Sequence, residues 1–236
     1  EEVAKIINPS AHYATTGIQV MEINTLSQLY SMKGSAQLDA AAHLLFMPDL
    51  FSYFLTGTIS NEYCIASTSE LLDARQRDWS WQTIDALGLP QHIFGPIVMP
   101  GTVRGKLRAD IAEETGLGEV EVVAVGSHDT ASAVAAVPAE EDGSLVAFLS
   151  SGTWSLLGVE NEKPITTKEA CRANFTNEGG AWGRYRYLKN IMGLWLIQES
   201  RRQWIREGEN VSYADLEREA LAAAPFKCFI DCDAPE

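Results

Sequence analysis

Two short polar clusters in this sequence carry residue types that could do chemistry. The first is Ser127-His128-Asp129-Thr130 and the second is Ser150-Ser151-Gly152-Thr153. A carboxylate such as Asp129, held beside a cleft, can accept a proton from a substrate hydroxyl. Gly152 lets backbone N–H groups approach an anion closely, and the hydroxyls beside it complete the composition of a phosphate-binding loop. A base for a hydroxyl together with a phosphate loop indicates phosphoryl transfer to an alcohol.

Each cluster follows a stretch that we predict to be a strand. Residues 122–125 form a continuous apolar run, which predicts a strand buried on both faces and ended by Gly126. Residues 145–149 predict a second buried strand, and residues 154–159 predict its returning partner. Both clusters therefore lie at strand ends, where open α/β sheets place their ligands.

The residues after Asp129 predict a helix. Small, helix-compatible residues run over 130–137 and stop at Pro138, so Asp129 occupies the expected N-cap position. The positive end of the helix dipole would help to keep its carboxylate ionised. Two plainer interpretations stay open, because Asp129 could be only a cap and residues 150–153 could be an ordinary hairpin turn.

Three other kinds of site are not supported. Ser127, His128 and Asp129 are consecutive, and adjacent side chains at a strand end splay apart instead of lining up as a hydrolase triad. His128 has no second histidine or cysteine at ligand spacing, so we expect no metal site built from protein ligands. The sequence also lacks the Gly-x-x-x-x-Gly-Lys-Ser/Thr loop of P-loop kinases.

Residues 190–207 predict an amphipathic helix, and residues 213–223 predict a second one capped by Ser212. Asn190 and Gln198 would lie about two turns apart and so near one face of the first helix. Such an amide pair could bind the ribose or a phosphate of a nucleotide. The alternative is that both residues only border an otherwise apolar helix.

The composition limits the partners. The 236 residues include 18 basic and 32 acidic side chains, for a net charge of −14. This balance argues against a broad nucleic-acid-binding face and against docking on an anionic membrane. The four cysteines form no C-x-x-C pair, and we find no signal peptide or long apolar run. We therefore expect a cytoplasmic protein with reduced thiols.

Four stretches together resemble the FGGY carbohydrate kinases, and within that family the rhamnulokinase branch. The resemblance extends through essentially the whole chain. The branch is indicated mainly by His128 and by the run Leu-Lys-Asn-Ile-Met-Gly-Leu-Trp. The stretches are Gly126-Ser-His-Asp-Thr-Ala-Ser-Ala-Val134, Leu149-Ser-Ser-Gly-Thr-Trp-Ser-Leu-Leu-Gly-Val-Glu160, Asn174-Phe-Thr-Asn-Glu-Gly-Gly180 and Tyr185-Arg-Tyr-Leu-Lys-Asn-Ile-Met-Gly-Leu-Trp-Leu-Ile-Gln198.

The resemblance implies an α/β fold of the actin-like, ribonuclease-H-like class with two lobes, incomplete in this chain. Residues 1–139 would be the latter part of the N-terminal, sugar-binding domain, and residues 140–236 the first part of the C-terminal, nucleotide-binding domain. The implied function is ATP-dependent phosphorylation of L-rhamnulose to L-rhamnulose 1-phosphate. The alternatives are a kinase for another ketose, or a sugar- or nucleotide-binding protein of the same fold without catalysis.

On the sugar side, the resemblance implies that Asp129 is the general base and that His128, Asp129 and Thr130 bind the sugar. Residues 62–69 are similar to a stretch that lines the sugar side of the cleft in the family. An alternative is that the hydroxyls of this stretch simply cap a helix near Leu71.

On the nucleotide side, the resemblance implies that Gly152 and Thr153 bind the transferring phosphate and that Asn190 and Gln198 contact the nucleotide. Mg²⁺ would be carried by ATP, with no protein ligand assigned to it. The partners expected are thus a small-molecule sugar and ATP.

The family's first phosphate hairpin and its adenine-binding glycines are not found in the sequence, so we interpret the chain as an internal segment of a longer kinase. Phosphoryl transfer depends on positioning and on charge stabilisation around the phosphate. The absent hairpin would also leave a strand edge exposed. Residues 1–236 alone are therefore expected to show no kinase activity above background and to associate or aggregate.

Overall fold

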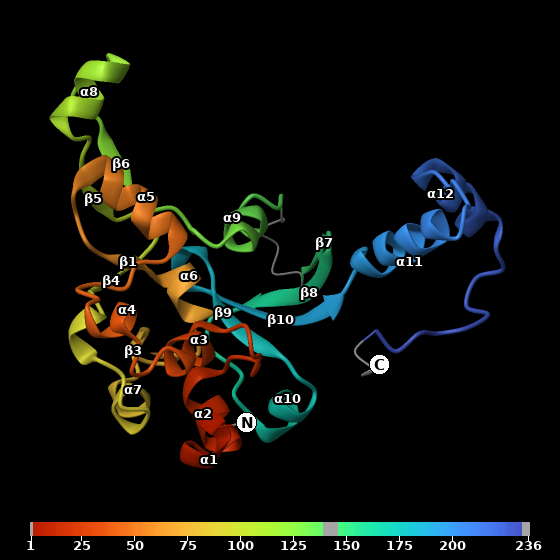
Figure 1. Cartoon of the computed structure of the whole chain (residues 1–236), viewed down its shortest axis with the longest axis horizontal. Helices are drawn as coiled ribbons and strands as arrows, with labels where there is room; N and C mark the ends of the chain where they lie inside the picture. Colours follow the sequence, from red (N-terminus) through yellow and green to blue (C-terminus); the bar gives the residue numbers. More distant parts are fainter. Residues whose placement is uncertain (1, 139–145, 233–236) are drawn as a thin grey trace. The chain divides into compact units, whose positions relative to one another are not determined.

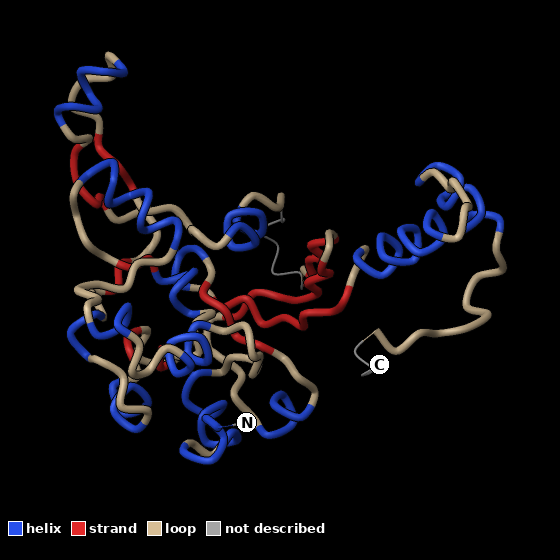
Figure 2. The backbone as a smooth tube through the Cα atoms, viewed as in Figure 1, coloured by secondary structure: helices blue, strands red, loops and turns tan. Residues whose placement is uncertain are grey.

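The computed structural model describes residues 2–138 and 146–232, and it divides into two compact units (Figure 1). The first unit comprises residues 1–147 and 158–189, and the second comprises residues 148–157 and 190–236. The first unit begins with five short helices, after which short strands and short helices are interspersed (Figure 2). The predicted domain boundary at residues 139 and 140 lies outside the described residues.

The first unit holds most of the regular elements. Its helices are α1 (Glu2–Ile6), α2 (Pro9–Thr16), α3 (Thr25–Ser31), α4 (Ala36–Asp39), α5 (Met47–Thr56), α6 (Tyr63–Ser67), α7 (Trp81–Ala86), α8 (Ala109–Thr115), α9 (Asp129–Ala135) and α10 (Lys168–Arg172), with 3₁₀ turns η1 (Gln91–Ile93) and η2 (Ala181–Gly183). Its short strands are β1 (Asn61–Glu62), β2 (Leu72–Asp73), β3 (Asp78–Trp79), β4 (Ile97–Val98), β5 (Val103–Lys106), β6 (Glu121–Val123) and β9 (Thr176–Gly179).

The strands within the described residues form four small sheets. β1 pairs with β4 in parallel, whereas β2 with β3 and β5 with β6 are antiparallel. The fourth sheet has the strand order β7-β8-β10-β9, and β9 and β10 run antiparallel. Its other strands are β7 (Ala147–Ser151), β8 (Trp154–Asn161) and β10 (Tyr185–Met192). β8 and β10 contribute residues to both units.

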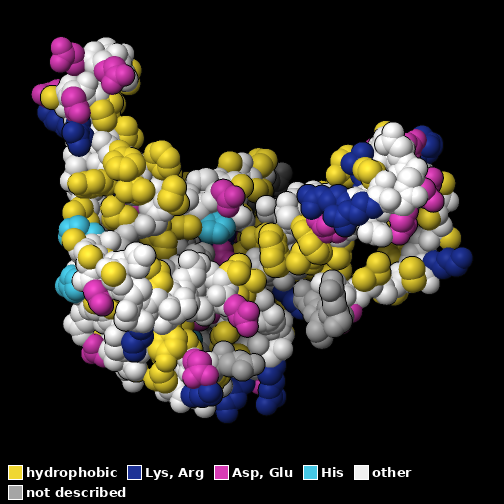
Figure 3. Space-filling view, in the orientation of Figure 1, with side chains coloured by type: hydrophobic (Ala, Val, Ile, Leu, Met, Phe, Trp, Pro, Cys, Tyr) yellow, Lys and Arg dark blue, Asp and Glu magenta, His cyan; other side chains and the backbone are white. Residues whose placement is uncertain are grey.

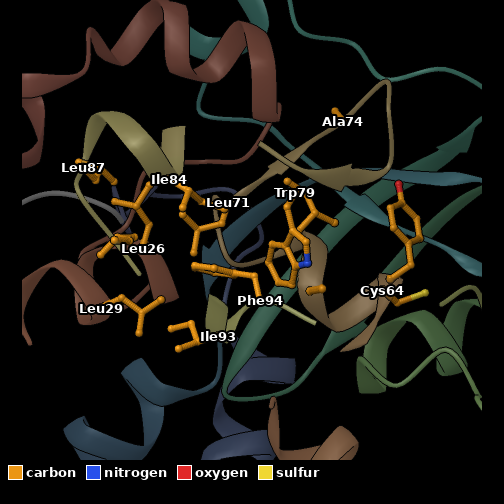
Figure 4. Packing of buried hydrophobic residues seen from close by; sticks show 14 of the residues in the cluster. Leu26, Leu29, Cys64, Leu71, Ala74, Trp79, Ile84, Leu87, Ile93 and Phe94 are labelled. Carbon is orange, nitrogen blue, oxygen red and sulfur yellow. The ribbon is translucent and has the colours of Figure 1, made fainter. Parts of the chain in front are cut away.

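One apolar core lies in the first unit. The rings of Trp79 and Phe94 meet edge to face with centroids 4.9 Å apart, and the Trp79 indole N–H donates to Gly95 O at 2.7 Å (Figure 4). Leucines of α3 and residues of α7 pack around this pair. α6 adds Tyr63 and Cys64, which are 1% and 0% exposed. The core therefore holds α6 in place. Glu62, the residue just before α6, belongs to the candidate site.

β6 differs from its sequence-based prediction. The run 122–125 was expected to be buried on both faces, but Val123 is 47% and Val125 62% exposed. β5 is the one strand that pairs with β6 among the described residues, so no second sheet neighbour covers these side chains. Figure 3 shows hydrophobic side chains gathered on the surface over α5, β5 and β6.

The second unit shows one confirmed and one wrong helix prediction. α12 (Tyr213–Ala222) begins at a capping box between Ser212 and Asp215, as the sequence indicated. The helix predicted over 190–207 is wrong in its first part. The chain stays in β10 through Met192, and α11 runs over Trp195–Arg206. Pairing of β10 with its neighbours overrides the helical spacing.

The predicted hairpin around residues 150–153 is present, with β7 and β8 as its strands, although residue 145 lies outside the described residues. The prediction that its first strand is buried is wrong, because Phe148 is buried but Leu149 is 60% exposed. The helix predicted near Leu71 is wrong, because α6 ends at Ser67 and strand β2 begins at Leu72. No described helix combines the length and the hydrophobicity that crossing a membrane requires.

Candidate active site

The turn between β6 and α9 carries the first polar cluster. The N-cap of α9 is His128 and not Asp129, which is a correction to the sequence-based assignment. His128 has extended backbone angles, and its Nδ1 accepts the Thr130 N–H at 3.2 Å. The ring satisfies a donor at the helix start, so the helix begins one residue earlier than predicted, at Asp129.

Asp129 presents its carboxylate to solvent. Its side chain is 96% exposed. Oδ1 accepts the Thr130 N–H at 2.6 Å and lies 3.3 Å from His128 Nδ1. The Thr130 hydroxyl is also 3.3 Å from Oδ1. The structure thus brings His128, Asp129 and Thr130 together and leaves Asp129 accessible as a proton acceptor.

A buried carboxylate, Glu62, ties this turn to α6. Glu62 is 0% exposed and caps α6 by accepting from Cys64 N at 2.8 Å and Ile65 N at 3.3 Å. Its Oε2 also accepts from both N and Oγ of Ser127, at 3.0 and 2.5 Å. One side chain therefore joins the start of a core helix to the loop that holds His128.

A second buried acid, Asp49, stands behind Glu62. Asp49 is 0% exposed and accepts the Glu62 N–H at 3.0 Å and Nη2 of Arg104 at 2.5 Å. Burial raises the pKa of Asp49, while the hydrogen bond and charge of Arg104 oppose that shift. The Asp49–Arg104 pair therefore holds the backbone of Glu62 in place.

His128 lies in a polar but mostly buried setting. Its Nε2 is 4.0 Å from Oε2 of Glu178, which in turn lies 3.0 Å from Nη2 of Arg186. Burial lowers the pKa of His128 below its ordinary value; the negative charge of Glu178 opposes this shift, and the positive charge of Arg186 adds to it. The ring is therefore neutral at about pH 7.

The sequence analysis included Glu62 only as the first residue of the stretch 62–69 and gave it no role of its own, and it did not single out Glu178 or Arg186 as site residues. Glu62 had one local signal, its position just before a short helix, where an acceptor side chain is favoured. Its bond to Ser127 spans 65 positions. Glu178 and Arg186 stand opposite each other on β9 and β10, and that register is set by strand pairing.

In the second unit, the β7–β8 turn rests on the start of α11. The amides of Gly193 and Leu194 donate to Thr153 O and Gly152 O, at 3.1 and 2.9 Å. A Cβ on Gly193 would lie 2.7 Å from Gly152 O, so glycine permits this approach. Among the described residues, the Thr153 amide and hydroxyl have no hydrogen-bond partner, which leaves both to bind an anion.

Asn190 and Gln198 belong to different elements of the second unit. Asn190 lies in β10, whereas Gln198 lies on α11, where its backbone N–H donates to Leu194 O at 3.0 Å. The expectation that they share a helix face is therefore wrong, because the helix starts only at Trp195. Both still flank the Gly193 turn that supports Gly152 and Thr153.

The acidic residues and histidines of the site do not form a metal centre. Across residues 2–138 and 146–232, no group of three or more His, Cys, Asp or Glu side chains is placed to hold a metal ion.

Comparison with known proteins identifies relatives for both halves of the chain. Residues 1–136 match the N-terminal domain model of the FGGY family of carbohydrate kinases, and residues 147–236 match its C-terminal domain model. The chain is 45% identical over 229 residues to a rhamnulokinase from Bacteroides thetaiotaomicron, covering 96% of this chain and 46% of that protein. It is 42% identical over 235 residues to a rhamnulokinase from Oceanobacillus iheyensis, covering 99% and 48%.

A solved structure agrees on the fold. The xylulose kinase from Rhodospirillum rubrum superposes with a TM-score of 0.76 over 95% of this chain and 46% of that chain, at 18% sequence identity. This likeness confirms the predicted α/β, actin-like fold. The chain spans about half the length of the curated relatives it matches.

The role of Glu62 leads to the first testable prediction. Glu62→Gln replaces an acceptor oxygen with an NH₂ group that faces backbone donors, and an unsatisfied buried group costs about 1–3 kcal/mol. We expect a lower free energy of unfolding and faster amide hydrogen exchange at residues 127–130, read by mass spectrometry on the full-length protein.

Glu70→Gln is the matched control. Glu70 is 2% exposed and accepts from Met21 N at 3.1 Å and Asn24 Nδ2 at 2.6 Å, away from this turn. We expect it to lower stability without changing exchange at residues 127–130. Unchanged exchange there in Glu62→Gln would show that Glu62 does not hold the turn.

Proposed function

This chain belongs to the FGGY family of carbohydrate kinases, and we propose that the full protein phosphorylates L-rhamnulose at its primary hydroxyl with ATP. The observation that carries the proposal is the 42–45% identity to two proteins named rhamnulokinase, over 96% or more of this chain. Because the chain spans about half of those relatives, the activity is proposed for the whole enzyme. The use of ATP fits the cytoplasmic location predicted from the sequence.

The proposed sugar site is the start of α9. Asp129 acts as the general base that takes the proton of the attacking hydroxyl, which its 96% exposed side chain supports. His128 and Thr130 hold the sugar, consistent with their contacts to the same turn. The bond that forms joins the sugar oxygen to the γ-phosphorus, and the bond that breaks releases ADP.

The proposed phosphate site is the β7–β8 turn. Gly152 and Thr153 bind the transferring phosphoryl group, and the support for this is that the Thr153 amide and hydroxyl have no hydrogen-bond partner within residues 2–138 and 146–232. Asn190 and Gln198 contact the nucleotide from β10 and α11. Mg²⁺ carried by the nucleotide would neutralise phosphate charge.

An ADP-release screen of the full-length protein against a panel of ketoses and glycerol tests the proposal. We expect turnover of L-rhamnulose and none of glycerol. Equal turnover of glycerol would refute the rhamnulokinase assignment, and preference for another ketose would support the alternative kinase. Binding of a sugar without ADP release would identify a non-catalytic protein of the same fold.

Asp129→Asn tests the base. The amide keeps the shape and the hydrogen bond to Thr130 N but cannot accept the proton, so kcat should fall by about 10²–10⁴-fold with a much smaller change in sugar affinity. Asp110→Asn is the control, since Asp110 is an exposed acid in the first turn of α8. Retention of more than about a tenth of the wild-type kcat would remove Asp129 from this role.

Thr153→Ala tests the phosphate turn. Loss of the hydroxyl should raise the KM for ATP and lower kcat while leaving the KM for the sugar nearly unchanged, because the group faces phosphate. Thr153→Ser keeps the hydroxyl and should restore both parameters. Titration of each substrate separately provides the measurement, and an equal loss for sugar and ATP would indicate a purely structural threonine.

A further inference from the structure

A buried pair of opposite charges lies behind His128. Arg186 and Glu178 face each other across the β9–β10 ladder, with Nη2 and Oε2 3.0 Å apart. Arg186 is 0% and Glu178 6% exposed, and Arg186 Nε donates to Gly179 O at 3.0 Å. Both charges are thus removed from water and fixed by the backbone of two paired strands.

The pair is not fully satisfied. Among the described residues, Glu178 Oε2 and both Nη atoms of Arg186 have no partner with hydrogen-bond geometry, despite the 3.0 Å approach. Burial of two charges with incomplete hydrogen bonding is seldom the most stable choice, and an apolar pair of similar volume is often as good or better. Stabilisation of the fold alone therefore does not explain why this buried pair is present.

The third partner is His128. Its Nδ1 accepts the Thr130 N–H at 3.2 Å, a donor that it shares with Asp129 Oδ1 at 2.6 Å, and this contact favours a neutral ring without a proton on Nδ1. The proton of the neutral ring is then on Nε2, the nitrogen that lies 4.0 Å from Glu178 Oε2. That separation is too long for a hydrogen bond, so the Nε2–H can donate to a substrate hydroxyl.

Charged groups from four elements act on this ring. Asp129 of α9 lies 3.3 Å from Nδ1, Glu178 of β9 lies near Nε2, and Glu62 of β1 adds a third negative charge, all of which favour a protonated ring. Burial and Arg186 of β10 favour the neutral ring. Burial raises the pKa of Glu160 of β8, and the charges of Arg184 and Arg186 oppose that rise.

We propose that Glu178 and Arg186 are positioning residues for His128: the negative charge of Glu178 beside Nε2 favours a proton on that nitrogen, and Arg186 offsets the charge of Glu178, so that the ring stays neutral with its proton on Nε2. The catalytic consequence rests on the proposed function. A neutral ring offers one donor to the sugar, whereas an imidazolium would form an ion pair with Asp129 and oppose proton transfer to that carboxylate.

Histidine NMR on the full-length protein tests the arrangement directly. With ¹⁵N- and ¹³C-labelled histidine, and His128→Gln to assign the signal, the ring should show the Nε2–H tautomer at about pH 7. Arg186→Met leaves Glu178 unopposed, so the titration midpoint of His128 should rise by about one unit or more. Glu178→Gln should lower it. Opposite shifts from two partners are not expected of residues that only support the fold.

Kinetics provide the second readout. In Arg186→Met, a ring with a higher pKa becomes protonated at higher pH, so the acid limb of kcat/KM for L-rhamnulose should move upward by the same amount. Raising the pH should restore most of the activity, and the KM for ATP should stay unchanged. Glu178→Gln should move the acid limb the other way.

Three further variants keep the test decisive. Glu178→Gln combined with Arg186→Met removes both charges, and should restore folding and a His128 midpoint near that of the wild type if a single variant fails to fold. Arg186→Lys keeps the charge and should keep the midpoint. Arg77→Met is the control. Arg77 Nε donates to Oη of Tyr185, the neighbour of Arg186 on β10, at 2.9 Å, but Arg77 is not among the charges that act on His128.

The outcomes separate this inference from the proposed function. A charged His128 at about pH 7, a proton on Nδ1, or midpoints that shift alike or not at all in the two single variants would overturn the inference. The expected tautomer and opposite shifts in a protein that does not phosphorylate L-rhamnulose would refute the function and leave the positioning role intact.

Discussion

The candidate site depends on one buried carboxylate with four donors around it. Glu62 accepts from Cys64 N and Ile65 N at the start of α6 and from both donors of Ser127 in the turn before α9. A buried carboxylate is tolerated only when its oxygens are satisfied, so the two helix starts cannot separate without leaving a charge or several N–H groups unpaired. The constraint is reciprocal, since the same bonds that satisfy Glu62 determine where His128 and Asp129 lie.

α6 transmits this constraint to the apolar core. Tyr63 and Cys64 belong to the same cluster as Trp79 and Phe94, while the residue just before them is the acid that holds the turn. Close packing makes such a core resist small displacements. Gly179 lets β9 approach α6 closely, because a Cβ at position 179 would lie only 2.7 Å from Tyr63 Cε1. Contact with the same helix therefore also positions Glu178, the residue before Gly179. Core and site are therefore positioned by one short element.

Local chemistry and the β7–β8 hairpin were predictable from the sequence, whereas pairing between strands far apart in the chain was not. The polar run at 127–130, the helix after it and the capping box of α12 follow from residue types a few positions apart. The fold class came from the family resemblance. The burial of residues 122–125 and the helix start at Asn190 were mispredicted, because an apolar run or a mixed periodicity does not say which strand lies alongside. Glu62, Glu178 and Arg186 were missed for the same reason, since charged residues are usually exposed unless a distant partner buries them.

Three carboxylates act on His128, and exposure separates what each can do. Glu62 is fully buried and saturated by donors, so it cannot take a proton from a ligand without breaking the fold around it. Glu178 is buried against Arg186, and its charge is already opposed. Asp129 alone among the three projects a 96% exposed side chain. Identical functional groups within one site are thus divided into a structural acceptor, a charge partner and a proposed base by solvation and hydrogen bonding alone. The residue type does not decide the role; burial, the hydrogen bonds to Glu62 and the charge of Arg186 beside Glu178 do.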